Sequence, residues 1–229
     1  MLNRDAKDRP KTTEALLMAV LFSIQLALSA TLAMPLPVLA KTVELGGVES
    51  YFPLVGGSFW EYDSNVGTMI FEIGSAVTQG GRQLHVVESS VNGTLVQREY
   101  YFIEAHRIYA YAREYPSGLL LLDPPEPMFD FPLAVGKVWN WIGRIGSFFE
   151  ADIDFKVLRE EVIEVPAGRF KTMRIRISGE ASDGSNTTTT RWFAEGVGMV
   201  KEVSEVVSRT GESFAVQAEL ATYRIGPAR

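Results

Sequence analysis

Cysteine is absent from the 229-residue sequence. This absence excludes disulfide bonds, thiolate metal ligands and cysteine nucleophiles. It also excludes a lipid-modified cysteine, so the chain is not predicted to be a conventional bacterial lipoprotein. Histidine is scarce as well, since His85 and His106 are the only two. They could join a carboxylate in a metal site, but we interpret them as isolated side chains, one in a strand and one in a turn.

Recognisable catalytic motifs are also missing. The sequence has no Gly-x-Ser-x-Gly nucleophile elbow, no Gly-x-x-x-x-Gly-Lys phosphate loop and no Gly-x-Gly-x-x-Gly motif. The acidic pairs Asp152/Asp154 and Glu160/Glu161 could in principle do acid–base work. Their alternating placement within a strand favours a solvated face instead. We therefore predict a non-enzymatic protein with no catalytic, cofactor-binding or metal-binding residues, and keep a hydrolase as the lesser alternative.

Basic residues are outnumbered by acidic ones, 22 against 28. Residues 1–40 hold four of the basic and three of the acidic residues, so the remainder has a net charge of −7. Such a surface repels phosphate backbones, which makes nucleic acid a poor partner. An anionic membrane surface is equally unattractive, because no basic amphipathic helix is evident.

One long apolar run is present near the N-terminus. Leu16–Ala40 contains no charged residue, and basic residues precede it. The run is interrupted by Pro35 and Pro37 and ends in small residues suited to cleavage after Ala40, which is typical of a secretory signal peptide. The alternative is an uncleaved helical anchor, since the 19 residues of Leu16–Met34 are close to the roughly 20 needed to cross a bilayer.

These features predict three segments. Residues 1–40 are expected to form the signal peptide or membrane anchor, 41–50 a linker, and 51–229 a single β domain. Because basic residues precede the apolar run, the start should stay in the cytoplasm while the rest crosses. We expect an exported protein, either periplasmic, extracellular or on the outer side of the cytoplasmic membrane. Any membrane contact would be made only by the N-terminal segment, if uncleaved.

The rest of the chain alternates short apolar stretches with Gly, Asn, Asp and Pro clusters, which is typical of β-strands. We predict an all-β, antiparallel, strongly curved sheet or half-barrel of roughly 10–12 strands, preceded by the N-terminal apolar helix. Asn92-Gly93 predicts a tight hairpin, and the proline-rich Asp123–Pro127 predicts a rigid connector. The expected strands are 58–62, 68–77, 83–91, 94–103, 107–113, 119–122, 138–141, 148–165, 170–179, 187–194, 199–207 and 214–224.

An internal repeat is visible at an offset of 79 residues. Phe52–Tyr62 matches Phe131–Trp141 in its Phe, Pro, Leu, Gly and Trp residues. We interpret the β domain as two related halves, 51–129 and 130–229. A duplicated motif without duplicated structure is the alternative.

The repeat places aromatic residues two positions apart in each half. Trp60 and Tyr62 should share one face of a strand, as should Trp139 and Trp141. Core packing is the favoured interpretation, because each such side chain buries about 150–250 Å². The functional alternative is that these four residues line an apolar pocket.

The motifs taken together resemble a large group of uncharacterised exported bacterial proteins. Their members open on a Phe-Pro-Leu…Gly…Trp-x-Tyr strand and close on a Gly-Val-Gly-Leu-Val-Lys hairpin, and many carry a lipoprotein cysteine that this chain lacks. The resemblance implies a β-rich fold similar to the curved half-barrel of LolA-like lipoprotein carriers, and no established activity. The matching segments are Phe52-Pro-Leu with Gly57 and Trp60-x-Tyr62, Phe131-Pro-Leu-x-Val-Gly-Lys-x-Trp139, Val165-Pro-Ala-Gly-x-Phe170, Trp192-Phe-Ala-x-Gly-Val-Gly-Met-Val-Lys201, and Glu219-Leu220 with Tyr223.

Two functional hypotheses follow. The first is a cell-envelope protein that binds a lipid, another hydrophobic ligand or an acylated partner on a concave β face. The second is a structural or assembly factor that acts through contacts with an envelope protein. The export segment and the aromatic pairs favour the first.

Overall fold

The computed structural model describes residues 47–147 and 149–226, which form thirteen strands and one short 3-10 helix. The predicted signal peptide and its apolar helix lie outside these residues. The first elements are η1 (Gly47–Ser50), β1 (Phe59–Ser64), β2 (Gly67–Ile73), β3 (Val77–Gln79), β4 (Arg82–Val91), β5 (Thr94–Glu104) and β6 (Arg107–Tyr115). The remaining ones are β7 (Gly118–Asp130), β8 (Val138–Ile145), β9 (Phe149–Val165), β10 (Gly168–Ala181), β11 (Asn186–Ala194), β12 (Gly198–Val207) and β13 (Ser213–Arg224).

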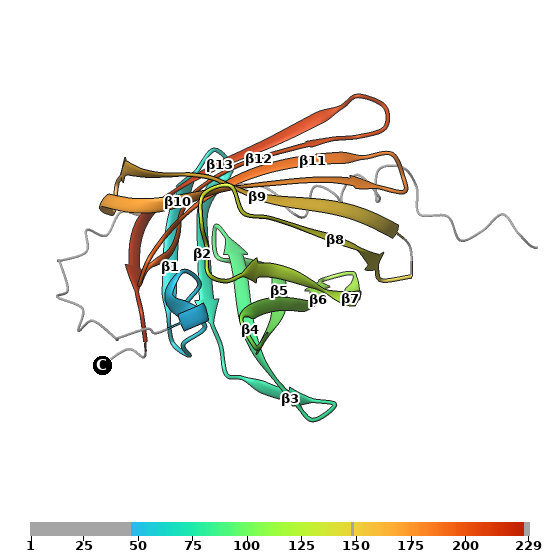
Figure 1. The fold of residues 1–229 in the computed structure, drawn as a ribbon, viewed down its shortest axis with the longest axis horizontal. Helices are drawn as coiled ribbons and strands as arrows, with labels where there is room; N and C mark the ends of the chain where they lie inside the picture. The colour runs from blue at the N-terminus through green and yellow to red at the C-terminus, as the bar shows by residue number, and fades with distance from the viewer. Residues whose placement is uncertain (1–46, 148, 227–229) are drawn as a thin grey trace, which may run out of the picture.

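The strands form one antiparallel sheet that closes on itself (Figure 1). Sequence neighbours pair from β4 through to β13, β13 then pairs with β1, and β1 pairs with β2. Closure comes from β2 and β4, which pair from Met69–Val91 to Ile73–Val87. The all-β, antiparallel prediction is confirmed, but the sheet is a closed barrel of twelve strands and not a half-barrel, with β3 as a short extension. Closure is favoured because it leaves no unpaired strand edges.

Strand formation follows the alternation in the sequence. In β9, residues Ala151, Ile153, Phe155 and Val157 are buried, and the residues between them are exposed. The predicted Asn92-Gly93 hairpin is confirmed, since both residues have positive φ, 49° and 78°, as a tight two-residue hairpin turn requires.

One end of the barrel is closed by the chain that enters β1. The carbonyl of Ser50 accepts a hydrogen bond from the amide of Gly196, so the last four residues of the predicted linker, η1, are docked on the barrel. Phe52 packs against Tyr101 and Phe129, with ring centroids 5.1 and 5.5 Å apart, and Phe129 meets Phe193 edge-on at 4.8 Å. These rings form an aromatic floor across the barrel.

The proline-rich segment is part of a strand, which corrects the predicted connector. Asp123–Pro127 lies within β7, although its prolines cannot donate to a ladder. The sheet accommodates them because β7 pairs with β8 only at Leu122–Ile145 and Asp123–Arg144, as far as the described residues show. Prolines are tolerated where a strand has little ladder bonding to lose.

The repeated motifs form matching turns. Gly57 and Gly136 both have positive φ, 80° and 88°, and each donates its amide to a carbonyl of a following strand, that of Ile73 or Val157, at 2.9 Å. In each turn the amide of the next residue also donates to the carbonyl three positions earlier. These bonds are Ser58 to Val55 at 3.0 Å and Lys137 to Ala134 at 2.9 Å. That the two whole halves are related stays a prediction.

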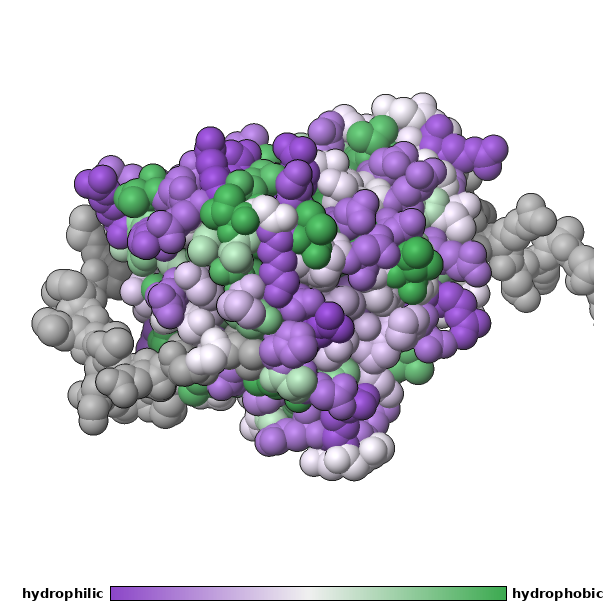
Figure 2. Space-filling model, in the orientation of Figure 1, coloured by the Kyte–Doolittle hydropathy of each residue, from purple (hydrophilic) through white to green (hydrophobic). Residues whose placement is uncertain are grey.

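The outer surface is mixed. Figure 2 shows hydrophilic residues over most of one face, with hydrophobic ones in small groups between them. Across residues 47–226, apart from 148, no helix has the length and apolar character needed to cross a bilayer.

Candidate functional site

The interior of the barrel contains a cavity of about 200 Å³. Eight-stranded barrels are just wide enough for their side chains to fill, and barrels of 16–18 strands hold an aqueous channel. A twelve-stranded barrel therefore has room that inward-facing side chains do not fill completely. Most of the lining is apolar, and it includes Phe52, Met69, Phe71, Val91, Met128 and Phe129.

A buried arginine lies in this lining. Arg113, on β6, is 1% exposed. Its Nε donates to Glu99 on β5 at 3.1 Å, and its Nη2 donates to Glu126 on β7 at 2.6 Å. Burial alone would lower the pKa of Arg113, but the charges of Glu126 and Glu99 outweigh it and raise the pKa above the ordinary value. The guanidinium is therefore held charged inside the barrel.

A second ion pair lies across the lumen. Arg191 on β11 donates from Nε to Glu202 on β12 at 2.6 Å, and both residues line the cavity. Burial would lower the pKa of Arg191, but the charge and hydrogen bond of Glu202 and, to a lesser extent, the charge of Glu99 raise it. The two ion clusters are therefore close enough to interact, and together they form a charged layer of Glu99, Arg113, Glu126, Arg191 and Glu202, named below the charged layer.

Tyrosine hydroxyls accompany these charges. Tyr101 donates to Glu99 at 2.8 Å, and Tyr62 donates to the carbonyl of Met199 at 2.9 Å. Burial, followed by the nearby glutamate charges of Glu99 and Glu202, raises the pKa of each phenol well above its ordinary value. Both phenols therefore stay neutral hydrogen-bond donors.

The predicted pocket residues divide into two groups. Trp60 and Tyr62 on β1 line the cavity. The indole nitrogen of Trp60 donates to the carbonyl of Val197 at 2.7 Å, which fixes the ring near the floor.

The other two predicted residues lie in the barrel wall and are not among the residues that line this cavity. The ring of Trp139 stacks on Phe155 at 5.1 Å, and its nitrogen donates to the carbonyl of Pro127 at 2.7 Å. Trp141 donates to the carbonyl of Pro124 at 2.8 Å. Both indoles thus bridge β8 to β7 where the ladder between these strands is short.

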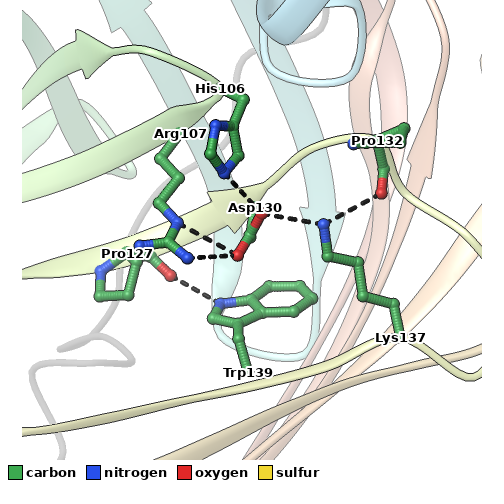
Figure 3. A network of polar contacts seen from close by, with 7 residues as sticks. All are labelled: His106, Arg107, Pro127, Asp130, Pro132, Lys137 and Trp139. Carbon is green, nitrogen blue, oxygen red and sulfur yellow. Dashed lines mark hydrogen bonds and ion pairs between the residues drawn. The ribbon is translucent and has the colours of Figure 1, made fainter.

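A second polar cluster lies at the closed end of the barrel (Figure 3). Asp130, at the end of β7, accepts hydrogen bonds from Arg107 at 2.8 Å and Lys137 at 2.8 Å, and His106 is 3.5 Å away. Burial would raise the pKa of Asp130, but the hydrogen bonds and charges of Lys137 and Arg107 lower it overall. Since the carboxylate is engaged by its neighbours, the cluster fastens the β5–β6 turn to the start of β8.

Metal-binding geometry is not found in the part of the chain that the structure describes, where no three histidine, aspartate or glutamate side chains are grouped to hold an ion. His85 lies in β4 and His106 in the β5–β6 turn. The arrangement in the barrel can enclose an apolar group and offer it charged and phenolic partners.

Sequence reasoning missed the charged layer. Its five members lie on five different strands, so no short motif contains them. The one available signal was Arg113, a charged residue in a strand otherwise rich in tyrosine and alanine.

Comparison with known proteins gives limited similarities. A protein-family profile described as DUF3108-like matches residues 149–213, which is less than a third of the chain. No curated protein matches the sequence.

Three solved structures are similar in shape. A proposed lipoprotein from Parabacteroides distasonis is 14% identical with a TM-score of 0.43, over 76% of this chain and 98% of that one. A Bacteroides fragilis protein with a YmcC-like fold, proposed to be exported, is 11% identical with a TM-score of 0.41, over 76% and 98%. The hypothetical lipoprotein YmcC of Escherichia coli is 11% identical with a TM-score of 0.39, over 79% and 87%. At these values the similarities assign no function to the chain.

Proposed function

We propose that this chain is an exported, non-enzymatic cell-envelope protein that binds an apolar or amphiphilic ligand inside its barrel. The observation that carries the proposal is the cavity of about 200 Å³ with aromatic and methionine side chains in its wall. A dry cavity of roughly 150 Å³ in another protein admits benzene. The space here therefore suits a slim ligand, such as one medium-length alkyl chain, from a lipid or an acylated partner.

Export is supported by the sequence of the N-terminal segment. The charge-free Leu16–Ala40 run, with Val38 and Ala40 at the positions that a signal peptidase reads, supports delivery across the cytoplasmic membrane. N-terminal sequencing of the protein from cell-envelope fractions is expected to begin at Lys41. A start at Met1 would contradict cleavage and favour an anchor.

Tryptophan fluorescence tests ligand binding directly. Of the four tryptophans in the sequence, Trp60 lines the cavity. A dibrominated fatty alcohol, whose bromine atoms quench indoles at short range, should quench the wild-type protein. Quenching should fall in Trp60→Phe and persist in Trp192→Phe, where the removed indole bonds Glu161 instead. Absence of saturable quenching in the wild type would overturn the proposal.

A second candidate function is supported by the outer surface. Val135, Val138 and Ile142, in and just before β8, are 59, 64 and 67% exposed. Exposed apolar side chains of this size favour a protein contact when they gather on one face. The alternative is therefore a structural or assembly factor, and crosslinking in cells should then yield one reproducible partner that Ile142→Lys abolishes.

A further inference from the structure

The charges that line the cavity do not balance. Among the lining residues that the structure describes, Glu99, Glu126, Glu180, Asp183 and Glu202 are acidic, whereas only the two arginines of the charged layer are basic. The formal charge of the lining is therefore −3. A cavity with one dominant sign of charge and low-dielectric walls concentrates ligands of the opposite sign.

The charged layer by itself also has a surplus carboxylate. Arg191 is matched by Glu202, whereas Arg113 faces two carboxylates, Glu99 and Glu126. Both guanidinium groups are thus already engaged. An anionic head group placed here would add a second uncompensated negative charge in a largely desolvated site, which is costly. A cationic head group would make the layer neutral.

Between the charged layer and the end opposite the aromatic floor the lining is mostly apolar, apart from Glu180 and Asp183 at its rim. Leu120, Ile145, Phe149 and Ile177 line the cavity toward the barrel end that carries the β6–β7, β8–β9 and β10–β11 turns. At the opposite end the aromatic floor blocks passage. A ligand would therefore enter with its charged head toward the layer and leave its chain among these side chains.

We propose that the ligand is a cationic amphiphile, an apolar chain that ends in an amine. This inference rests on the proposed binding of a ligand in the barrel and names its chemical class. Glu99 is the carboxylate best placed to meet the amine, because its side chain is 20% exposed, compared with 3% for Glu126 and 7% for Glu202.

A series of ligands with the same chain length shows how the head group alone affects binding affinity. Decylamine, decanol and decanoate would each displace the neutral probe N-phenylnaphthylamine from the full protein at pH 7, below their micelle concentrations. An amine of lysine-like pKa, about 10.4, is then protonated. We expect decylamine to bind at least tenfold more tightly than decanoate, with decanol between them. Equal or tighter binding of decanoate would overturn the inference and leave the proposed function standing.

Two variants test whether the preference for an amine over a carboxylate head group depends on the charged layer. Glu99→Gln removes the surplus negative charge of the layer and should reduce the ratio of amine to carboxylate affinity by about tenfold. Glu164→Gln, an exposed change on β9, should leave the ratio unchanged, so that a general effect of protein charge is excluded. A ratio unaltered in Glu99→Gln, with the variant shown to be folded by urea denaturation, would overturn the assignment to the charged layer. If the probe and all three ligands fail to bind the wild type, the proposed function itself fails.

Discussion

The indole nitrogen of Trp141 lies 2.8 Å from the carbonyl oxygen of Pro124 and donates a hydrogen bond to it. This bond joins β8 to β7, where the ladder holds two residue pairs within the described chain. Trp139 makes the equivalent bond to Pro127 at 2.7 Å. Proline has no amide hydrogen to donate, which limits the backbone ladder at this seam. The two indole N–H groups add hydrogen bonds between the strands by donating to the proline carbonyls.

Trp141→Phe should destabilise the barrel and loosen this seam first. The change keeps an aromatic ring but removes the indole donor, and a typical hydrogen bond contributes about 0.5–1.5 kcal/mol net. Pro124 is exposed, so water can reach its carbonyl in the variant. Urea denaturation should show that loss. Hydrogen exchange should be accelerated in β8 more than in β12. Uniform acceleration in both strands would contradict a local seam.

Arg113→Met should be far more damaging than a comparable change at the surface. Removing Arg113 leaves the buried Glu126 without its counter-charge and takes an ion-pair partner from the partly exposed Glu99, which costs about 3–5 kcal/mol in the free energy of unfolding. The double variant Arg113→Met/Glu126→Gln should recover part of the loss, because one of the two charges is gone.

The control for this prediction is Arg144→Met. Arg144 pairs with Asp123 at the same 2.6 Å, but both side chains are more than 60% exposed. Exposed pairs contribute about 0–1 kcal/mol, so the free energy of unfolding measured by urea denaturation should hardly change. A similar cost for the buried and the exposed variant would show that the charged layer does not depend on Arg113.

Much of this fold could be predicted from the sequence, since alternation and turn residues are local signals. The Asn92-Gly93 hairpin and the buried row in β9 are examples. The closure of the barrel could not be predicted, because it depends on β2 meeting β4 after the short β3 excursion, and no local pattern encodes that pairing. The charged layer was hidden for a similar reason: Glu99 and Glu202 are ordinary acidic residues until the barrel brings their strands face to face. The prediction of a connector at Asp123–Pro127 was wrong because prolines usually argue against a strand. They are accommodated in β7 because its ladder with β8 is short.

Gly57→Ala and Gly136→Ala should cost similar amounts of stability. Both glycines have φ near +80°, where an alanine is strained by about 1–2 kcal/mol. A Cβ on Gly136 would meet no atom within 4 Å, so the cost there comes from the backbone alone. Gly56→Ala is the control, since its Cβ would lie at an ordinary 3.8 Å from the carbonyl oxygen of Gly74. Thermal or urea unfolding would measure all three, and a large loss at only one of the two motif glycines would weaken the predicted equivalence of the halves.

Asp130→Asn should change how stability depends on pH. The pKa of Asp130 is lowered in the fold, so the carboxylate stabilises the protein above its unfolded pKa of about 3.9. That contribution is lost as the pH falls through the lower, folded pKa. At pH 7 the variant should be less stable by about 1–3 kcal/mol, because two charged hydrogen bonds, from Arg107 and Lys137, are weakened. The difference between the two proteins should begin to shrink as the pH falls below the unfolded pKa of about 3.9, and it should be lost below the lower pKa at which folded Asp130 takes up its proton. Urea denaturation at a series of pH values would measure it, and a difference that stays constant down to pH 2 would show that the Asp130 charge does not hold this cluster together.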